Sequence, residues 1–370
     1  MWIAHTESSQ GWGGQEIRIL SESEGLRARG HRVTVIAPAS ARVHQEARRR
    51  GIETADLQVA RKSLRGVVAL RRWLAAHPVD VINTHSSTDS WIAAVACSTL
   101  RAPPAIVRTR HVSVPIAKNA ATRWLYTGAT RHIVTTGETL RRQLIDENRF
   151  PAERLTSVPT GIDARRFAPG DRAAARGATG LPADRTLIGI VATLRSWKGH
   201  RFLIDAFARL EGTALGRQLG LVIVGGGPQR DAIEAQVASL GLGDRVVLAG
   251  DQADVLPWLQ ALDVFALPSY ANEGVPQALV QAMLCGLACV TTGIGAIPEA
   301  ARDGATAVVV PAQDVDALAR ALARLVADPA LRQRLGQAAR EHCMRQFGYE
   351  TMLDRMEAVF RNAAAARQPA

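Results

Sequence analysis

Short runs of apolar and β-branched residues alternate with longer segments of helical pattern along almost the whole chain. In the first half these runs lie at residues 2–5, 32–37, 79–84, 105–110 and 132–135. In the second half they lie at residues 186–192, 221–224, 246–249, 263–267, 289–292 and 307–310. Strands that alternate with helices predict parallel sheets covered by helices, so we expect an α/β fold.

A turn-rich segment separates the two series of strands. Residues 158–171 contain prolines and glycines without apolar periodicity, which is typical of a connection between domains. A length of 370 residues also fits two domains. We place the boundary so that the domains are 1–163 and 164–348. Apolar residues at helical spacing predict a final helix over about 349–370 that packs back on the first domain.

The composition excludes several classes of protein. Apolar residues make up 47% of the chain and charged residues 21%, which is globular rather than disordered or fibrous. The four cysteines form no Cys-x-x-Cys pair and no histidine stands at zinc-ligand spacing, so we expect neither a disulfide framework nor a bound metal. No stretch has the length and apolarity of a membrane span, and the first residues lack a signal-peptide pattern, so we expect a cytoplasmic protein.

Positive charge is concentrated in the first domain. The net charge is +11, and residues 1–165 carry 24 basic and 14 acidic residues. This excess favours an anionic partner, although arginine used as a general surface residue gives the same count. Nucleic-acid binding is one class that the excess allows. An aromatic content of 5% and the lack of a recognised binding module argue against it.

A glycine-rich segment, residues 8–16, follows the first expected strand and leads into a helix. Glycines such as Gly13 and Gly14 let the backbone approach a ligand, and a helix start presents free N–H groups to an anion. We therefore expect a phosphate there. The spacing does not match a dinucleotide fingerprint, and an empty tight turn is the alternative interpretation.

Two further segments of the second half carry polar groups at strand ends. Arg195 and Lys198 lie three residues apart at a helix entry, where both side chains can reach one diphosphate; a solvated basic face is the alternative. Gly226 and Asp251 each follow the end of an expected strand. The carboxyl ends of such strands are where the base and ribose of a nucleotide are usually received.

The most specific segment is residues 268–286. Pro276 and Gly286 delimit a short helix, Glu273 stands in the loop before it, and Gln281 lies inside it. A carboxylate and an amide at these positions can hold sugar and ribose hydroxyls. For Glu273, helix capping is the alternative role.

Taken in order, these motifs closely resemble those of the retaining glycosyltransferases of family 4, also called glycosyl transferases group 1. The resemblance includes the glycine loop, a Val-Pro-Asn-Gly-Ile-Asp crossing with Thr160 in place of Asn, an Arg-x-x-Lys-Gly pair and a Gly-Gly-Gly-Pro strand end. It also includes a Glu-x7-Glu signature, with Gln281 in place of the second Glu. It implies the GT-B fold, in which two facing Rossmann-like domains with parallel sheets have a cleft between them.

The resemblance also implies roles for matching residues. Gly13 and Gly14 match the loop that meets the donor diphosphate. Arg195 and Lys198 match the pair that neutralises the leaving nucleoside diphosphate. Glu273 matches the first signature glutamate, which holds hydroxyls of the donor sugar.

Other positions match less closely or on the acceptor side. His111 matches a histidine near the reacting centre, and His85 is a weaker acceptor-side candidate. Gln281 departs from the family because it replaces the second signature glutamate, which bonds the ribose; an amide keeps neutral hydrogen bonds there. Gly274 and Val275, next to Glu273, are expected to bind the donor.

The expected function is transfer of a sugar, of hexosyl type, from a nucleoside diphosphate sugar to an acceptor hydroxyl with retention at the anomeric carbon. The acceptor is expected to be a glycan or lipid-linked molecule in the assembly of lipopolysaccharide, glycolipid or another cell-surface polysaccharide. The resemblance implies no cofactor and no obligatory metal, in keeping with the lack of an Asp-x-Asp motif. A GT-B epimerase acting on a nucleotide sugar is the alternative.

Two segments of the first domain suggest a membrane surface. Residues 61–74 and 118–126 combine basic residues with tryptophans at helical spacing, which suits the headgroup layer of an anionic membrane. We therefore expect the first domain to dock at the inner membrane face. If Leu70, Trp73, Trp124 and Leu125 are core residues, the segments are ordinary surface helices instead.

Overall fold

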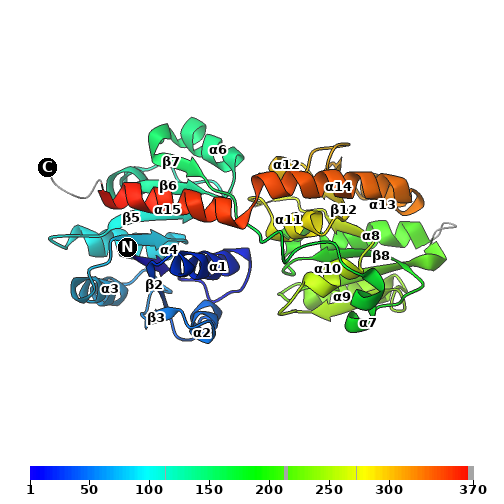
Figure 1. The fold of residues 1–370 in the computed structure, drawn as a ribbon, viewed down its shortest axis with the longest axis horizontal. Coiled ribbons are helices and arrows are strands. Elements are labelled where there is room, and N and C mark those ends of the chain that lie inside the picture. Colours follow the sequence, from blue (N-terminus) through cyan, green and yellow to red (C-terminus); the bar gives the residue numbers. More distant parts are fainter. Residues whose placement is uncertain (113, 212–215, 272, 366–370) are drawn as a thin grey trace. The chain divides into compact units, whose positions relative to one another are not determined.

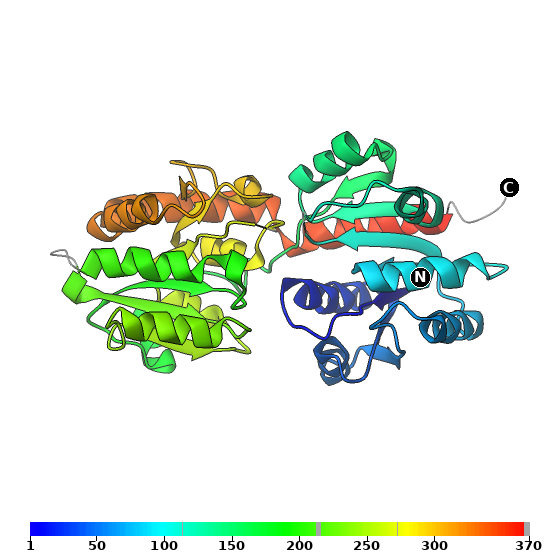
Figure 2. The ribbon, with the colours of Figure 1, turned by 180° about the vertical axis from the view of Figure 1, so that it is seen from behind.

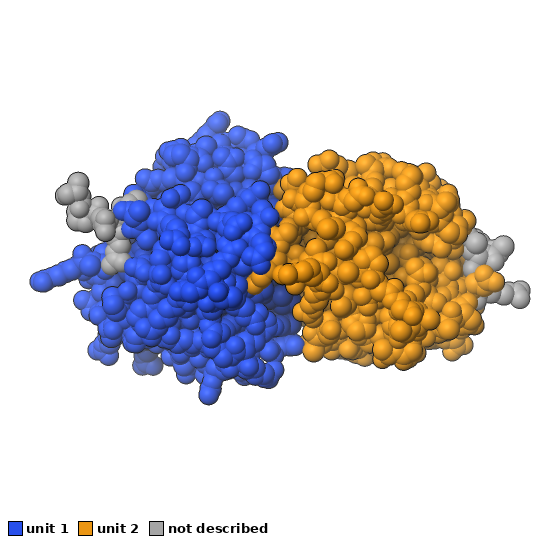
Figure 3. Space-filling model, in the orientation of Figure 1, with its two compact units in different colours: residues 1–161, 350–370 blue, residues 162–349 orange. Residues whose placement is uncertain are grey.

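The computed structural model describes residues 1–112, 114–211, 216–271 and 273–365. The chain forms two compact units, coloured separately in Figure 3. Unit 1 comprises Met1–Gly161 and Glu350–Ala370, and unit 2 comprises Ile162–Tyr349. The sequence placed this boundary between residues 163 and 164. Each unit has a parallel sheet and an apolar core of its own.

Unit 1 contains a seven-stranded parallel sheet in the order β3-β2-β1-β4-β5-β6-β7. Its strands are β1 (Trp2–Thr6), β2 (Arg32–Ala37), β3 (Glu53–Asp56), β4 (Val81–Thr84), β5 (Ala105–Arg110), β6 (His132–Thr135) and β7 (Leu155–Ser157). Its α-helices are α1 (Gly14–Ala28), α2 (Arg42–Arg49), α3 (Leu64–Ala76), α4 (Ser87–Ser98), α5 (Ala120–Arg123), α6 (Glu138–Asn148) and α15 (Tyr349–Ala365). A π-helix at Trp124–Ala129 continues α5.

Two strands of unit 1 were not predicted, and both lie at the edges of the sheet. β3 has the sequence Glu-Thr-Ala-Asp and no buried residue, and β7 has three residues. Edge strands are paired on one side and part-exposed, so they lack the continuous apolar run that identifies a buried parallel strand.

Unit 2 contains a six-stranded parallel sheet in the order β10-β9-β8-β11-β12-β13. Its strands are β8 (Thr186–Val191), β9 (Leu219–Val224), β10 (Val246–Gly250), β11 (Val264–Leu267), β12 (Ala288–Thr292) and β13 (Val308–Val310). Its α-helices are α7 (Arg172–Thr179), α8 (His200–Glu211), α9 (Arg230–Ser239), α10 (Leu256–Ala261), α11 (Gln277–Leu284), α12 (Ile297–Ala300), α13 (Val315–Ala327) and α14 (Pro329–Gln346). Figures 1 and 2 show helices flanking both sheets.

Each sheet has one point at which the order of its strands reverses. In unit 1 the chain proceeds outward from β1 in one direction and from β4 in the other; in unit 2 the corresponding pair is β8 and β11. The loops that leave two such strands diverge to opposite faces of the sheet, which opens a crevice at the carboxyl ends where α/β proteins bind ligands. The topology therefore points to the loops after β1 and β4 and after β8 and β11.

The last helix, α15, belongs to unit 1 from Glu350 onward, and residues 366–370 of the predicted segment lie outside the described chain. Its apolar face is buried, and the Phe360 ring packs edge-on against His5 of β1 with 6.2 Å between centroids. Near the start of α15, Glu350 and Asp354 contact Arg29, which directly follows α1, at 2.6 Å and 2.8 Å respectively. Arg29 also contacts Glu357 at 3.3 Å, so a single guanidinium joins α1 to three acids of α15.

Replacing Arg29 by alanine is expected to loosen α15. The variant should lose about 1 kcal/mol of unfolding free energy, because a part-exposed ion-pair network contributes little more than that. Hydrogen exchange of the α15 amides should quicken while exchange in unit 2 stays unchanged. Arg361→Ala is the matched control, since Arg361 contacts the same Glu357 from one turn along α15 itself. An equal effect of both variants would contradict a linking role for Arg29.

Candidate functional site

The loops that follow β8, β9 and β10 are tied together at the carboxyl edge of the unit 2 sheet. The amide of Leu194 donates to the Gly226 carbonyl at 2.9 Å, and the amide of Gly225 donates to the Gly250 carbonyl at 2.8 Å. A Cβ atom on Gly226 would lie 3.3 Å from the Cβ of Asp251. The predicted pair Gly226 and Asp251 is therefore brought together, next to the loop that carries Arg195.

Lys198 and Glu273 form a close ion pair at the point where the strand order reverses. Lys198 ends a short 3-10 turn after β8, and Glu273 lies in the loop after β11. The Lys198 Nζ lies 2.6 Å from Glu273 Oε1, with the two side chains 18% and 5% exposed. Gly199, at φ 79°, allows the close approach, because a Cβ there would lie 2.1 Å from the Pro268 carbonyl oxygen. Residues 75 positions apart thus share one site.

The structure contradicts the capping alternative for Glu273. The N-cap of α11 is Pro276, and no side chain caps this helix. The Glu273 carboxylate is instead directed to Lys198, and its carbonyl accepts from the amide of Ala296 at 3.3 Å in the loop after β12. Gly274 and Val275 are buried between Glu273 and α11.

Gln281 and Arg195 lie on the two elements that flank this pair. Gln281 is half-buried in the middle of α11, and Arg195 is exposed at the start of the turn that ends in Lys198. Among the described residues Arg195 makes no ion pair; its guanidinium carbon lies 5.6 Å from the centroid of the Trp197 ring. A cation without an acidic partner beside a part-buried ion pair is suited to receive an anionic ligand.

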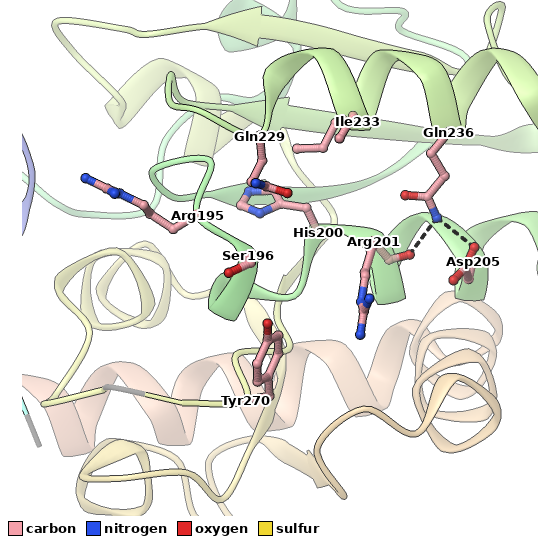
Figure 4. Close-up of a pocket in the computed structure, with 10 residues that line it drawn as sticks. Arg195, Ser196, His200, Arg201, Asp205, Gln229, Ile233, Gln236 and Tyr270 are labelled. Carbon is pink, nitrogen blue, oxygen red and sulfur yellow. Dashed lines mark hydrogen bonds between the residues drawn. The ribbon is translucent and has the colours of Figure 1, made fainter. Parts of the chain in front are cut away.

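A cavity of about 340 Å³ lies between α8 and α9 (Figure 4). Its lining includes His200, Asp205, Gln229 and Tyr270. Of the predicted site residues Arg195 alone lines it. The cavity lies between the two helices and reaches the carboxyl edge of the strands at Arg195, Gln229 and Tyr270. We assign the candidate site to that edge, where Lys198 and Glu273 meet.

In unit 1, the glycine loop is anchored by a buried glutamate. Glu7 follows β1 and is fully buried; its carboxyl accepts from the amide of Ser9 at 2.7 Å and from the side chain of Gln15. Gly13 occupies the N-cap of α1 and Gly14 its first turn, and no side chain caps this helix. The start of α1 thus lies in this loop, where the positive end of the helix dipole suits an anion.

Burial changes the ionisation of the Glu7 carboxyl, which anchors the glycine loop. Removal from water, together with the nearby Asp89 and Glu16 carboxyls, raises the pKa of Glu7 to about 8. Near neutral pH the Glu7 carboxyl is therefore largely protonated in the folded chain.

The two predicted histidines are brought into direct contact. His85 follows β4 and His111 follows β5, and His85 Nδ1 lies 2.9 Å from His111 Nε2. The other ring nitrogen of His85 lies 3.0 Å from His5 Nδ1. The ring of His85 is thus buried, at 5% exposure, and bonded on both sides, which contradicts its prediction as an acceptor contact. His111 is partly exposed, whereas His5 and His85 are buried.

Sequence reasoning missed His5, Asn83 and Glu22, which surround this histidine pair. Each stands inside a regular strand or helix and is fully buried. His5 and Asn83 face each other in the register of β1 and β4. His5 and Asn83 carry one signal in the sequence, because each is a polar residue inside an otherwise apolar strand.

Comparison with known proteins adds to this geometry. The family model described as "Glycosyltransferase Family 4" matches residues 12–166, and the model "Glycosyl transferases group 1" matches residues 171–342. The two models meet near the boundary between the units and together span most of the chain. The chain belongs to the group 1 glycosyltransferases.

Relatives and solved structures agree with this family. A "GDP-mannose-dependent alpha-(1-6)-phosphatidylinositol monomannoside mannosyltransferase" of Mycolicibacterium smegmatis is 29% identical over 373 residues, covering 93% of this chain and 94% of the relative. A "D-inositol 3-phosphate glycosyltransferase" of Saccharomonospora viridis is 33% identical over 57% of this chain. The match spans 51% of that relative, about half of its length.

The structure of Anabaena HepE in complex with UDP and glucose is similar in fold, with a TM-score of 0.86 and 21% identity, covering 98% of this chain and all of that one. The two parallel-sheet units and this likeness give the group 1 chain the GT-B fold predicted from the motifs.

The protonated state of Glu7 predicts a pH dependence of stability. Because the folded pKa lies above the unfolded value of 4.5, this group stabilises the fold fully below about pH 4.5 and loses that contribution as pH rises towards 8. In Glu7→Gln, urea unfolding between pH 5 and pH 8 should show a decline shallower than in the wild type by on the order of 1 kcal/mol per pH unit. Glu138→Gln, at an exposed helix start, is the control and should leave the slope unchanged. Parallel pH profiles for Glu7→Gln and wild type would refute the assignment.

Proposed function

We propose that this group 1 glycosyltransferase transfers a sugar from a nucleoside diphosphate sugar to an acceptor hydroxyl, with retention at the anomeric carbon. The observation that carries the proposal is the Lys198–Glu273 pair beside Arg195 at the reversal point of the unit 2 sheet. That arrangement offers cations for a diphosphate and a carboxylate for sugar hydroxyls within one site.

The chemical demand of the reaction is to stabilise negative charge that grows on the departing diphosphate. Arg195 and Lys198 supply fixed positive charge, and Glu273 holds Lys198 in place before the donor binds. Glu273 then accepts hydrogen bonds from donor-sugar hydroxyls, and Gln281 bonds the ribose. Because two side chains can balance the diphosphate charge, we propose that no obligatory metal and no cofactor take part.

The remaining predicted residues fit the same donor. Gly226 and Asp251 stand together at the ends of β9 and β10, where the base side of a nucleotide is received, and Gly274 and Val275 lead from Glu273 into α11. In unit 1, the uncapped start of α1 at Gly13 is a second place suited to a phosphate.

For the acceptor, we propose a glycan or lipid-linked molecule of a cell-surface polysaccharide, glycolipid or lipopolysaccharide. Support comes from the Mycolicibacterium relative, whose name specifies a phosphatidylinositol monomannoside. Among the described residues, no helix is both long and apolar enough to cross a membrane.

We further propose that unit 1 docks on the anionic inner face of a membrane through a patch formed by Lys62, Leu64, Trp91 and Trp124. Leu64 is 78% exposed and Trp124 is 41% exposed. The rings of Trp91 and Trp124 lie 5.9 Å apart, and Lys62 lies 5.5 Å from the Trp91 ring centroid. Exposed apolar and aromatic side chains beside a cation suit the headgroup layer.

Part of the sequence expectation for this surface is wrong. Leu70 is fully buried and Leu125 is 2% exposed, so both are core residues. Trp73 packs against Trp2, with ring centroids 6.1 Å apart, and stacks on His77. The proposed contact is therefore limited to the start of α3, Trp91 of α4 and the start of the π-helix.

The function is tested with a panel of nucleoside diphosphate sugars and lipid-linked acceptors. The chain should use one donor of the panel, and transfer of the sugar should require an acceptor.

Arg195→Ala should lower turnover by roughly 100-fold without changing the melting temperature, because it removes an exposed cation aimed at developing charge. Arg209→Ala at the far end of α8 is the control. Free epimerised nucleotide sugar formed without acceptor would favour the epimerase alternative. A loss of turnover under threefold in Arg195→Ala would contradict the assignment of Arg195 to the diphosphate.

Restoring the second signature glutamate tests the ribose assignment. In Gln281→Glu, activity should be retained and nucleoside diphosphate binding should tighten by roughly 1 kcal/mol, because one neutral hydrogen bond becomes charge-assisted. Isothermal titration with the selected nucleoside diphosphate measures the change. An inactive variant would mean that Gln281 does not hold the ribose.

Vesicle co-sedimentation tests the docking patch. The chain should bind vesicles with anionic lipid, should not bind neutral vesicles, and should bind less as salt rises. Leu64→Ser/Trp124→Ser should weaken binding several-fold, whereas Leu240→Ser, which changes an exposed leucine of unit 2, should not. Equal binding to both kinds of lipid, or none, would leave a soluble acceptor as the better interpretation.

A further inference from the structure

Three histidines of unit 1 form a continuous hydrogen-bonded chain that starts in the core and ends at the sheet edge. His5 Nδ1 lies 3.0 Å from His85 Nε2, and His85 Nδ1 lies 2.9 Å from His111 Nε2. Neighbouring rings are tilted by 31°, with centroids 5.3 Å and 5.2 Å apart. The rings come from three adjacent positions at the ends of β1, β4 and β5.

All three imidazoles are neutral in the folded chain. Burial, with a further contribution from Arg18, lowers the pKa of His5 to about 3. Burial likewise holds the pKa of His85 and of His111 well below the usual range. A neutral imidazole carries one N–H and one lone pair, so each ring can donate only once. Both hydrogen bonds of the chain must then run in the same direction.

The inner end of the chain decides which direction this is. His5 Nε2 lies 3.9 Å from Glu22 Oε1, and neither of these buried atoms has a hydrogen-bond partner in the described chain. The other Glu22 oxygen lies 3.3 Å from Arg18 Nε, with both side chains fully buried. Burial raises the pKa of Glu22, and the Arg18 guanidinium acts against this rise by favouring the carboxylate form. A carboxylate oxygen favours an N–H opposite it, which places the proton of His5 on Nε2.

A second contact selects the same direction. The side-chain oxygen of Asn83 accepts from the Thr109 hydroxyl at 3.0 Å, so its amide nitrogen is the atom that faces His5 Nδ1, at 3.5 Å. The Asn83 N–H thus favours an acceptor at His5 Nδ1, in the same direction as Glu22 does. His5 Nδ1 then receives the N–H of His85 Nε2, and His85 Nδ1 receives the N–H of His111 Nε2.

We propose that Glu22, His5 and His85 are positioning residues that hold His111 as its Nε2–H tautomer and leave the Nδ1 lone pair to accept a hydrogen bond from a substrate hydroxyl. The substrate part of this inference rests on the proposed function. Donation along the chain towards a carboxylate strengthens the outermost lone pair, because successive hydrogen bonds polarise one another. His111 accordingly acts as a fixed acceptor rather than as a proton donor.

The tautomers can be observed directly in the full chain. With ¹⁵N-labelled histidine, long-range ¹H–¹⁵N spectra at pH 7.5 separate Nδ1–H, Nε2–H and doubly protonated rings. The nine histidines are assigned by single His→Gln variants. His5, His85 and His111 should all be Nε2–H tautomers. An Nδ1–H tautomer or an imidazolium at His111 would overturn the proposal.

Glu22→Gln should reverse the chain. Its amide oxygen would stay on Arg18 and its amide nitrogen would donate to His5 Nε2, so the His111 proton should move to Nδ1. Turnover with the selected donor should fall about tenfold in kcat with little change in KM. Glu24→Gln, on the exposed side of the same helix, is the matched control and should change neither tautomer nor kcat. An unaltered His111 spectrum in folded Glu22→Gln would contradict the positioning role.

A second variant keeps the test decisive if Glu22→Gln does not fold. His5→Phe keeps a ring packed on Phe360 but removes the acceptor for His85, so the His111 signals should become a mixture of both tautomers. Retention of a single Nε2–H tautomer in that variant would overturn the proposal. The spectra need no substrate: an Nε2–H chain without sugar transfer would refute the proposed function alone, and transfer with the opposite tautomer would refute the histidine chain alone.

Discussion

All strands of both sheets are parallel, and this places every carboxyl strand end of a sheet along one edge. The chemistry of the chain is concentrated in loops that leave those ends. The reversal of strand order then selects one pair of loops in each unit, after β1 and β4 and after β8 and β11. Lys198 and Glu273 occupy the second pair, and the glycine loop and His85 belong to the first. The same arrangement recurs in both units because the same topology does.

The two units provide their buried polar groups with partners in different ways. In unit 2 the central contact is an ion pair that is partly open to solvent, with Lys198 18% exposed, so an incoming anion can compete for its charge. In unit 1 the polar groups below the edge are buried more deeply, and Arg18, Glu22 and His5 are fully enclosed. Charges enclosed in this way need partners or neutral forms. The Arg18–Glu22 pair and the neutral histidine chain meet that need, and the result is a rigid base under His111.

Much of the fold and part of the candidate site could be predicted from the sequence. The central strands are runs of β-branched residues, so their positions agree closely with the structure, as at Arg32–Ala37 and Ala105–Arg110. The edge strands β3 and β7 could not be predicted because pairing on one side requires little apolar sequence. Among the site residues, Lys198 and Glu273 were found because each stands in a short motif near glycine or proline. His5 and Glu22 stand in regular elements, where nothing local marks them.

The sequence by itself determined where the strands and turns form, which loops carry charge, and which residue types are present at each strand end. These properties depend on neighbours within a few positions, which the linear pattern contains. The tertiary structure alone decided which of these residues meet. Contact between His5 and His85, 80 positions apart, depends on the register of β1 against β4, where His5 lies opposite Asn83. The burial that keeps these rings neutral is likewise set by the packing of α1 and α15, so the direction of the histidine chain is a property of the folded unit.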